Sequence, residues 1–330
     1  MEGYTKNLSL LKQGCFYSTE NSRALLEADK ILDSQRTDKS QPTSAKQWHE
    51  FLRSKGNFYH GFVNKKFFEH VSQPSSPTGF CPNHYAIKGQ VLPSEALDSL
   101  IKGLTFLDCG AIMDVGYYKA ILEVIGKEKF DVIFSRESET PLCIGRKNLL
   151  NPINSLIVGK EYKKISQLKK GEMAHIRSIE DYRIKHLNGE AAGFNVICIE
   201  EGKNPKFIGF GLNPAGVTVE EITEVLRKEY NKAEVNDSDQ FTPEIATKLR
   251  KDHSKADVKK RRKLKTETLT SEQFKKRGGG RIIPEGYQAL DTEKIEMLKN
   301  ASTSVCQTLL KKWQNDYVVD FKKHHPMPNQ

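Results

Sequence analysis

The sequence predicts an α+β domain in which a buried helix is followed by an antiparallel sheet. Three observations carry this prediction. Apolar side chains recur at helical spacing through 111–125. Two strand-like apolar runs, 194–200 and 207–212, are joined by a turn that contains glycine and proline, as in a hairpin. A second amphipathic pattern, 218–230, begins with a threonine and a glutamate spaced as a helix-capping box.

Weaker signals predict the remaining elements. Pro93 begins a short helix that ends near residue 103. Residues 130–134 are apolar and predict either a strand or a short helix. Residues 173–176 follow a turn and predict a strand, and 292–321 predict one long amphipathic helix.

Cysteine usage and charge limit the class of protein. The six cysteines are scattered and form no Cys-x-x-Cys pair, so we expect neither a disulfide framework nor structural zinc, and a reducing compartment. The net charge of +10 comes from one stretch, because 245–281 holds 14 basic and 4 acidic residues. The remainder is neutral, which argues against a nucleic-acid-binding fold for the whole chain.

These patterns predict four segments. Residues 1–45 form a peripheral N-terminal segment, 46–241 the α+β domain, 242–281 a basic helical or flexible arm and 282–330 a C-terminal helix. The basic part of the arm is expected to contact an anionic surface or to act as a nuclear-localisation signal.

No apolar run is long enough for a transmembrane segment. The N-terminus also lacks the pattern of a usual signal peptide. We therefore expect the protein in the cytoplasm, or in a host cell that it reaches without such a signal, as a bacterial effector would.

Cys109 stands where the central helix begins, and it is the candidate nucleophile. The first turn of a helix presents unpaired N–H groups and a positive dipole end, which favour thiolate over thiol. Asp108 has the oxygen of an N-cap residue, and Gly110 lets a substrate approach the sulfur. The alternative is that Cys109 is a buried structural residue.

A nucleophile helix followed by an antiparallel sheet is the order of a papain/transglutaminase-like core, with helical N- and C-terminal flanks in this chain. Within 104–231 the sequence resembles the bacterial spore-type protein-glutamine γ-glutamyltransferases. The matching pieces are Leu107–Gly110, Gly171–Glu172, Asp181–Tyr182, His186–Glu190, Gly193–Ile197, Phe207–Gly211 and Tyr230–Asn231. The resemblance implies a thiol nucleophile at Cys109 and acyl transfer on a protein substrate.

The sequence departs from that family at the partners of the nucleophile. Phe194 stands where the family pattern has glutamate, and Phe210 stands where it has histidine. A thiol without a base is poorly activated, so another residue has to serve. His186 with Glu190 as its orienting acid is the first candidate pair.

Secondary candidates for the same roles are His175 as the base and Asp181 as the acid. Asn195 and Asp108 complete this set. The proposed reaction is transamidation, deamidation or a related cleavage, and it needs no metal or cofactor.

Two alternatives use the same residues differently. His186-x-x-x-Glu190 resembles the motif of effector-type AMP or nucleotidyl transferases, which also use an upstream serine, such as Ser135, Ser138 or Ser155. In that case Cys109 is structural. The other alternative is a catalytically inactive binding module that has kept the fold.

Overall fold

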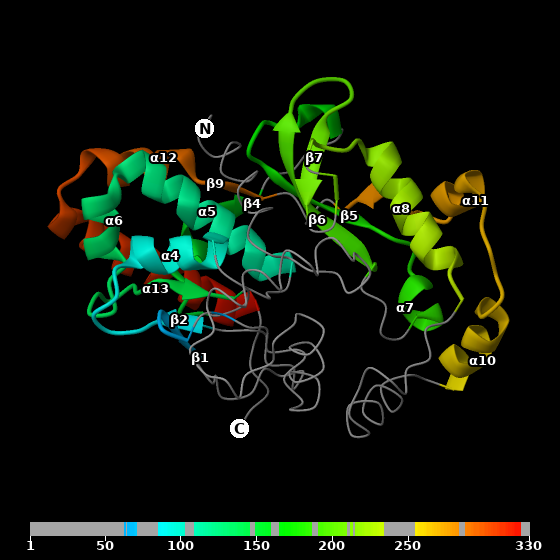
Figure 1. The fold of residues 1–330 in the computed structure, drawn as a ribbon, viewed down its shortest axis with the longest axis horizontal. Coiled ribbons are helices and arrows are strands. Elements are labelled where there is room, and N and C mark those ends of the chain that lie inside the picture. Colours follow the sequence, from blue (N-terminus) through cyan, green and yellow to red (C-terminus); the bar gives the residue numbers. More distant parts are fainter. Residues whose placement is uncertain are drawn as a thin grey trace. The chain divides into compact units, whose positions relative to one another are not determined.

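The computed structural model describes Val63 and residues 65–70, 85–102, 109–145, 149–159, 165–186, 191–209, 212–213, 215–233, 255–283 and 288–324. Helices and antiparallel strands occur together in these residues, which confirms the predicted α+β class (Figure 1). None of the helices in this part of the chain is long and apolar enough to cross a membrane. The predicted segment 1–45 lies outside the described residues.

The chain divides into two compact units. Among the described residues, the first unit contains those from 63 to 158 and from 289 to 324, and the second unit contains those from 159 to 288. The predicted boundaries after residues 45, 241 and 281 stay predictions.

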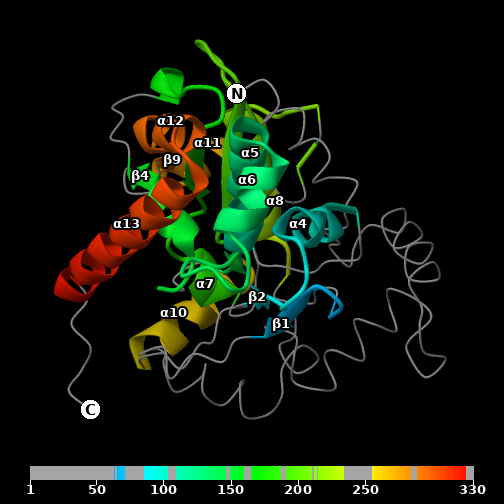
Figure 2. The same cartoon turned by 90° about the vertical axis from the view of Figure 1, so that its left-hand side faces the viewer.

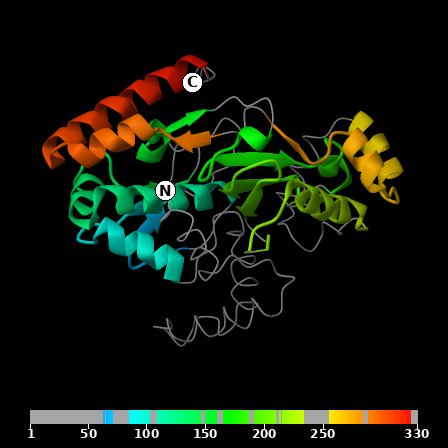
Figure 3. The same cartoon turned by 90° about the horizontal axis from the view of Figure 1, so that it is seen from above.

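Helix α5 (Cys109–Ile125) is the centre of the first unit, and it confirms the predicted helix. Its residues are apolar around most of the helix, which is the pattern of a helix buried on all sides. Three shorter helices pack on it or beside it, as Figures 2 and 3 show: α4 (Pro93–Lys102), α6 (Lys127–Ile133) and α12 (Thr292–Asn300).

Gly126 separates α5 from α6. Its φ of 84° is accessible to glycine at low cost, which allows the chain to turn between the two helices. The apolar run 130–134 therefore lies mostly in a helix, where Phe130, Ile133 and Phe134 are buried. This resolves the strand-or-helix ambiguity of the sequence.

The C-terminal region differs from the single long helix predicted for 292–321. It forms α12 and then α13 (Thr303–His324). Ala301 has an extended backbone at the break. The Nζ atom of Lys129 donates to the carbonyl oxygens of Leu298, Lys299 and Ala301 at 3.1, 2.7 and 2.8 Å, which satisfies the end of α12. The amphipathic period alone does not reveal a cap that comes from a distant lysine.

A small antiparallel sheet completes the first unit. Its strands are β1 (Phe68–His70), β2 (Tyr85–Ile87) and β3 (Cys143–Ile144), in that order. The 3₁₀ turn η1 (Pro152–Leu156) packs against α13.

The second unit is built on antiparallel strands β5 (Met173–Arg177), β6 (Gly193–Glu200) and β7 (Lys206–Gly209). The predicted hairpin is confirmed by the pairing of β6 with β7, although β7 ends at Gly209. The full strand order is β4-β9-β5-β6-β7, and β8 (Arg281–Ile282) also pairs with β5. Strands β4 (Ile157–Gly159) and β9 (Gln288–Leu290) lie where the chain passes between the units. A 3₁₀ turn, η2 (Ile165–Gln167), precedes β5.

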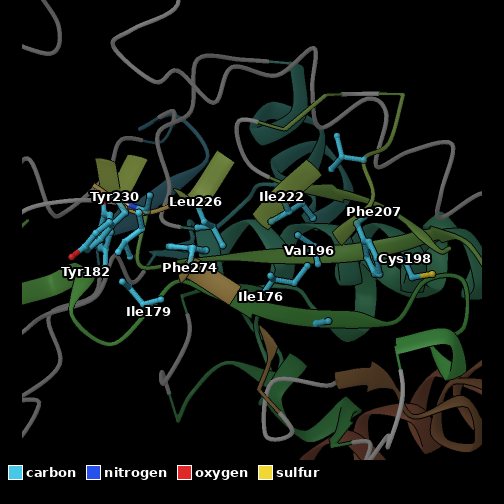
Figure 4. Packing of buried hydrophobic residues seen from close by; sticks show 14 of the residues in the cluster. Ile176, Ile179, Tyr182, Val196, Cys198, Phe207, Ile222, Leu226, Tyr230 and Phe274 are labelled. Carbon is cyan, nitrogen blue, oxygen red and sulfur yellow. Dashed lines mark hydrogen bonds between the residues drawn. The ribbon is translucent and has the colours of Figure 1, made fainter. Parts of the chain in front are cut away.

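Helix α8 (Val219–Asn231) covers one face of this sheet. It begins with the predicted capping box, in which Thr218 and Glu221 each satisfy the backbone of the other. Figure 4 shows Ile222 and Leu226 of α8 packing over Ile176, Val196 and Phe207 of the strands. The short helix α7 (Tyr182–Lys185) adds Tyr182 to the same core.

Part of the predicted basic arm folds onto the second unit as α10 (Lys255–Leu264), α11 (Ser271–Lys276) and β8. Leu264, Leu269 and Phe274 are buried, and α11 packs on α8 while α10 packs on α7 (Figure 1). The sparse apolar residues of this charged stretch are thus its attachment points.

Replacing Gly279 with alanine is expected to destabilise the second unit. A Cβ atom at this position would overlap the buried Phe274 ring, with 2.6 Å to its Cζ atom. Overpacking of this kind costs about 2 kcal/mol, and chemical denaturation measures the loss. Gly159→Ala is the matched control, because nothing lies within 4 Å of a Cβ atom there. Equal stability of the two variants would contradict this packing.

Candidate active site

Cys109 is the first residue of α5, as the sequence predicts. The N–H groups of a first helical turn have no partner within the helix, and they stabilise negative charge beside them. The structure does not describe the Cys109 side chain, and Asp108 lies outside the described residues. The helix start is therefore established, while the cap and the position of the sulfur stay predictions.

A buried polar cluster fixes the next turns of α5. The Asp114 Oδ2 atom accepts from the backbone N–H of Gly145 at 3.2 Å and from Asn151 Nδ2 at 3.0 Å. The Tyr118 hydroxyl donates to Asn151 Oδ1 at 2.7 Å. Burial, followed by the nearby Cys143 and Asp114, raises the pKa of Tyr118 well above its usual value. This cluster holds α5 against η1.

His175 and Asn195 form a hydrogen-bonded pair across two strands. They are opposite each other in the register of β5 and β6, and His175 Nδ1 lies 2.8 Å from Asn195 Oδ1. Because an amide oxygen only accepts, Nδ1 carries the proton in this arrangement. The lone pair on Nε2 can then accept a proton, as a general base requires.

The second nitrogen of the His175 ring lies against Gly193. A Cβ atom at 193 would overlap His175 Nε2 and come within 2.8 Å of its Cε1. Glycine at this position therefore permits the observed ring orientation.

His186 is placed in a different environment from His175. Its ring is buried beside Tyr182 and Tyr230, and Nε2 donates to the carbonyl oxygen of Tyr230 at 2.9 Å. Burial lowers the pKa of His186, and this outweighs the opposing effect of the hydrogen bond. His186 therefore joins α7 to the end of α8, and its predicted partner Glu190 lies outside the described residues.

Lys185 is the residue of this region that sequence reasoning missed. It is 1% exposed, and Nζ donates to the carbonyl oxygens of Tyr230 at 2.7 Å and Glu267 at 2.6 Å. The amine also lies 4.4 Å from the centroid of the Tyr230 ring, a cation–π distance. Burial lowers the pKa of Lys185. A lysine inside a short amphipathic helix gives no sequence signal of burial, because its partners are far along the chain.

Asp181 forms ion pairs rather than a contact with His186. Its carboxylate pairs with Lys260 of α10 and with Arg277 after α11. Burial raises the pKa of Asp181, but the hydrogen bonds from the two cations outweigh it, so the pKa lies below its usual value. Arg277 also pairs with Glu267 at 2.7 Å, and Glu267 accepts from the Tyr230 hydroxyl. These contacts attach the basic segment to α7 and α8.

The other described cysteines are poor nucleophiles. Burial raises the pKa of Cys143 to about 12, and burial with nearby carboxylates raises that of Cys198 to about 12. Cys306 is buried in α13, where its thiol donates to Leu298. The candidate serines are also held locally, since Ser138 and Ser155 donate to backbone carbonyls three residues earlier. In the described ranges no cluster of histidine, cysteine and acidic residues could hold a metal ion.

Comparison with solved structures finds similarity to a bacterial transglutaminase. A transglutaminase from Geobacillus stearothermophilus, solved without its C-terminal extension, matches 51% of this chain and 70% of its own, with 19% identity and a TM-score of 0.39. No protein-family model and no curated protein matches the sequence. The α+β class therefore stands on the helices and sheet described above, and the papain/transglutaminase-like core stays a proposal.

Lys185→Met is expected to lower the free energy of unfolding by about 2 kcal/mol, because the Glu267 carbonyl oxygen loses its Lys185 donor and the Tyr230 carbonyl oxygen keeps only His186. Urea denaturation measures the change. Lys228→Met on α8 is the control, since Lys228 is exposed and its replacement should cost less than about 0.5 kcal/mol. Similar losses in both variants would show that the buried contacts of Lys185 contribute little.

His186 is expected to make stability fall as pH falls. Its pKa is lower in the folded chain than in the unfolded chain, so the unfolded state takes up a proton first. The contribution of His186 is complete above its unfolded pKa of about 6.5 and is lost as pH decreases through that value. Between about pH 7.5 and pH 5, the native protein should therefore lose more stability than His186→Gln. Identical pH profiles in urea unfolding would contradict this assignment.

Proposed function

We propose that the protein carries out thiol-dependent acyl transfer on protein side chains, with Cys109 as the nucleophile, His175 as the general base and Asn195 as the residue that orients it. The observation that carries the proposal is the 2.8 Å contact between His175 Nδ1 and Asn195 Oδ1. An amide that fixes the tautomer of a histidine is the arrangement that an activated cysteine requires.

His175 suits the role of base better than His186. His175 is partly exposed on a strand, and its hydrogen bond leaves Nε2 for a reacting proton. His186 is buried, and its Nε2 already donates to the Tyr230 carbonyl. Using His186 as the base, or as the histidine of nucleotidyl transfer, would first require rearrangement of that buried contact.

The assignment of His175 and Asn195 is also compatible with Phe194 and Phe210, where the sequence departs from the spore-type pattern. Phe194 packs against the core of the second unit and has no group that accepts a proton. Asn195, the next residue along β6, lies on the opposite face of the strand. In the proposal the pair His175–Asn195 supplies the function that the family assigns to positions 194 and 210.

The proposed reaction has two steps, formation of a thioester and transfer of its acyl group. Nε2 of His175 removes the proton of the Cys109 thiol, and the sulfur attacks the carboxamide carbon of a glutamine side chain. The C–N bond breaks, the imidazolium returns the proton to the leaving nitrogen, and ammonia departs from a thioester. A primary amine then attacks this thioester, which gives a new amide and restores the thiol. Water in place of the amine gives glutamate.

The start of α5 contributes to both steps. The N–H groups of its first turn can hold the oxygen that becomes negatively charged as the tetrahedral intermediate forms. The positive end of the helix dipole also stabilises the thiolate of Cys109. No metal or cofactor takes part in these steps, and the substrate class is a protein with accessible glutamine side chains.

The proposal predicts that Cys109 reacts fastest with iodoacetamide at neutral pH. The buried Cys143 and Cys198 should react far more slowly, because their pKa values are about 12. His175→Ala should slow the labelling of Cys109 about tenfold, and mass spectrometry of the digested chain measures each site. His175→Ala and Cys109→Ser should both abolish incorporation of a fluorescent primary amine into a glutamine-containing protein.

His186→Gln is the matched control for this experiment, and it should keep at least half of the labelling rate at Cys109. If Cys109 reacts no faster in the folded chain than in urea, the thiol mechanism is wrong. If His186→Gln slows labelling while His175→Ala does not, the base is wrongly assigned. Rapid labelling with no amine incorporation and no ammonia release would limit the protein to a recognition role.

A further inference from the structure

The segment 255–283 concentrates positive charge on the second unit. It contains eleven basic and three acidic residues, whereas the chain without 245–281 is neutral. Helix α10, helix α11 and strand β8 present this segment beside α7 and α8 (Figure 1). We call it the basic segment.

The basic segment is held in place by specific contacts. Lys260 and Arg277 both pair with Asp181 of α7. Asn231 at the end of α8 accepts from the N–H of Leu269 at 2.8 Å and donates to its carbonyl at 2.9 Å. The Arg227 guanidinium donates to the same carbonyl at 2.8 Å. Because the segment is fixed, its charges form a defined surface rather than a mobile tail.

Five cations on the described side chains of helices α10 and α11 are exposed and have no carboxylate partner among the described residues. They are Lys259, Arg262, Lys263, Lys275 and Lys276. Lys259, Arg262 and Lys263 are separated by three and four residues, so they lie on one face of α10. The two cations that do form ion pairs, Lys260 and Arg277, serve to attach the segment. The five exposed cations named above are available for an anionic ligand.

The composition of the surface indicates which anionic ligand fits. No exposed side chain between 259 and 281 is aromatic or large and apolar. Stacking on single-stranded bases and insertion into a bilayer both need such side chains.

We propose that the basic segment binds the phosphate backbone of a nucleic-acid duplex without reading its sequence. A duplex has a high linear density of phosphates, and lysine and arginine side chains bind it by releasing condensed counterions. Five phosphate contacts give a slope of about −4 for the logarithm of the association constant against the logarithm of salt concentration. The affinity of the basic segment for the duplex depends on charge and not on base sequence. It should therefore lie in the range of nonspecific binding.

Fluorescence anisotropy with a labelled 20-base-pair duplex of mixed sequence tests the proposal on the full chain. Binding should be detectable at about 50 mM salt and should weaken at least a hundredfold by about 200 mM. The triple variant Lys259→Glu, Arg262→Glu, Lys263→Glu should lose at least tenfold in affinity and have a shallower salt slope. A second duplex of unrelated sequence should bind equally well.

The control is a triple variant with the same change in net charge in the first unit: Lys127→Glu, Lys322→Glu, Lys323→Glu, all at exposed lysines. It should bind the duplex within about twofold of the native chain. Equal loss in both triple variants would show a net-charge effect and overturn the assigned surface. Tighter binding to a single strand of equal length, or binding only to phosphatidylserine vesicles, would overturn the duplex as ligand. Unchanged thermal unfolding excludes misfolding as the cause.

Discussion

The register of β5 on β6 is the constraint on which the second unit depends. It places Ala174 and Ile176 on the face that packs under α8, together with Val196. The same register places His175 opposite Asn195 on the other face. A shift by one residue would move the imidazole to the face under α8 and the core residues to the other face, so packing and the His175–Asn195 contact are specified by the same pairing.

A second constraint is the buried cluster around the Tyr230 carbonyl. This one oxygen accepts from both Lys185 and His186, which ties α7 to the end of α8. Glu267 brings the loop before α11 into the same cluster. Transferring a charged group from water to the protein interior costs free energy. Such a cluster therefore defines which groups pair more readily than it raises the free energy of unfolding. These contacts explain why His186, which resembles a catalytic base in the sequence, has a structural role here.

Elements with complete local signals could be predicted from the sequence. The capping box of α8, the apolar α5 ended by Gly126 and the β6–β7 hairpin are examples. The break between α12 and α13 was not predictable, because the lysine that satisfies it is about 170 residues away in sequence. For the same reason the sequence could name His175 and Asn195 as candidates but could not pair them.

The choice between His175 and His186 shows the same limit for the candidate site. Sequence spacing favoured His186, because Glu190 follows it by four residues across a turn. We propose His175 instead, because its partner Asn195 is a cross-strand neighbour while His186 Nε2 is bonded to the Tyr230 carbonyl. Spacing along the chain measures proximity only within a helix or turn, whereas strand register measures it across a sheet.

The two proposals concern different sides of the second unit. His175 and Asn195 lie on the face of β5 and β6 opposite the core that α8 covers. The exposed cations lie on α10 and α11, which pack on α7 and α8. Charge reversal on α10 should therefore leave the His175–Asn195 contact unchanged, because no described contact joins the exposed cations to that pair. If both activities exist, duplex binding would localise or concentrate the protein rather than alter the acyl-transfer chemistry itself.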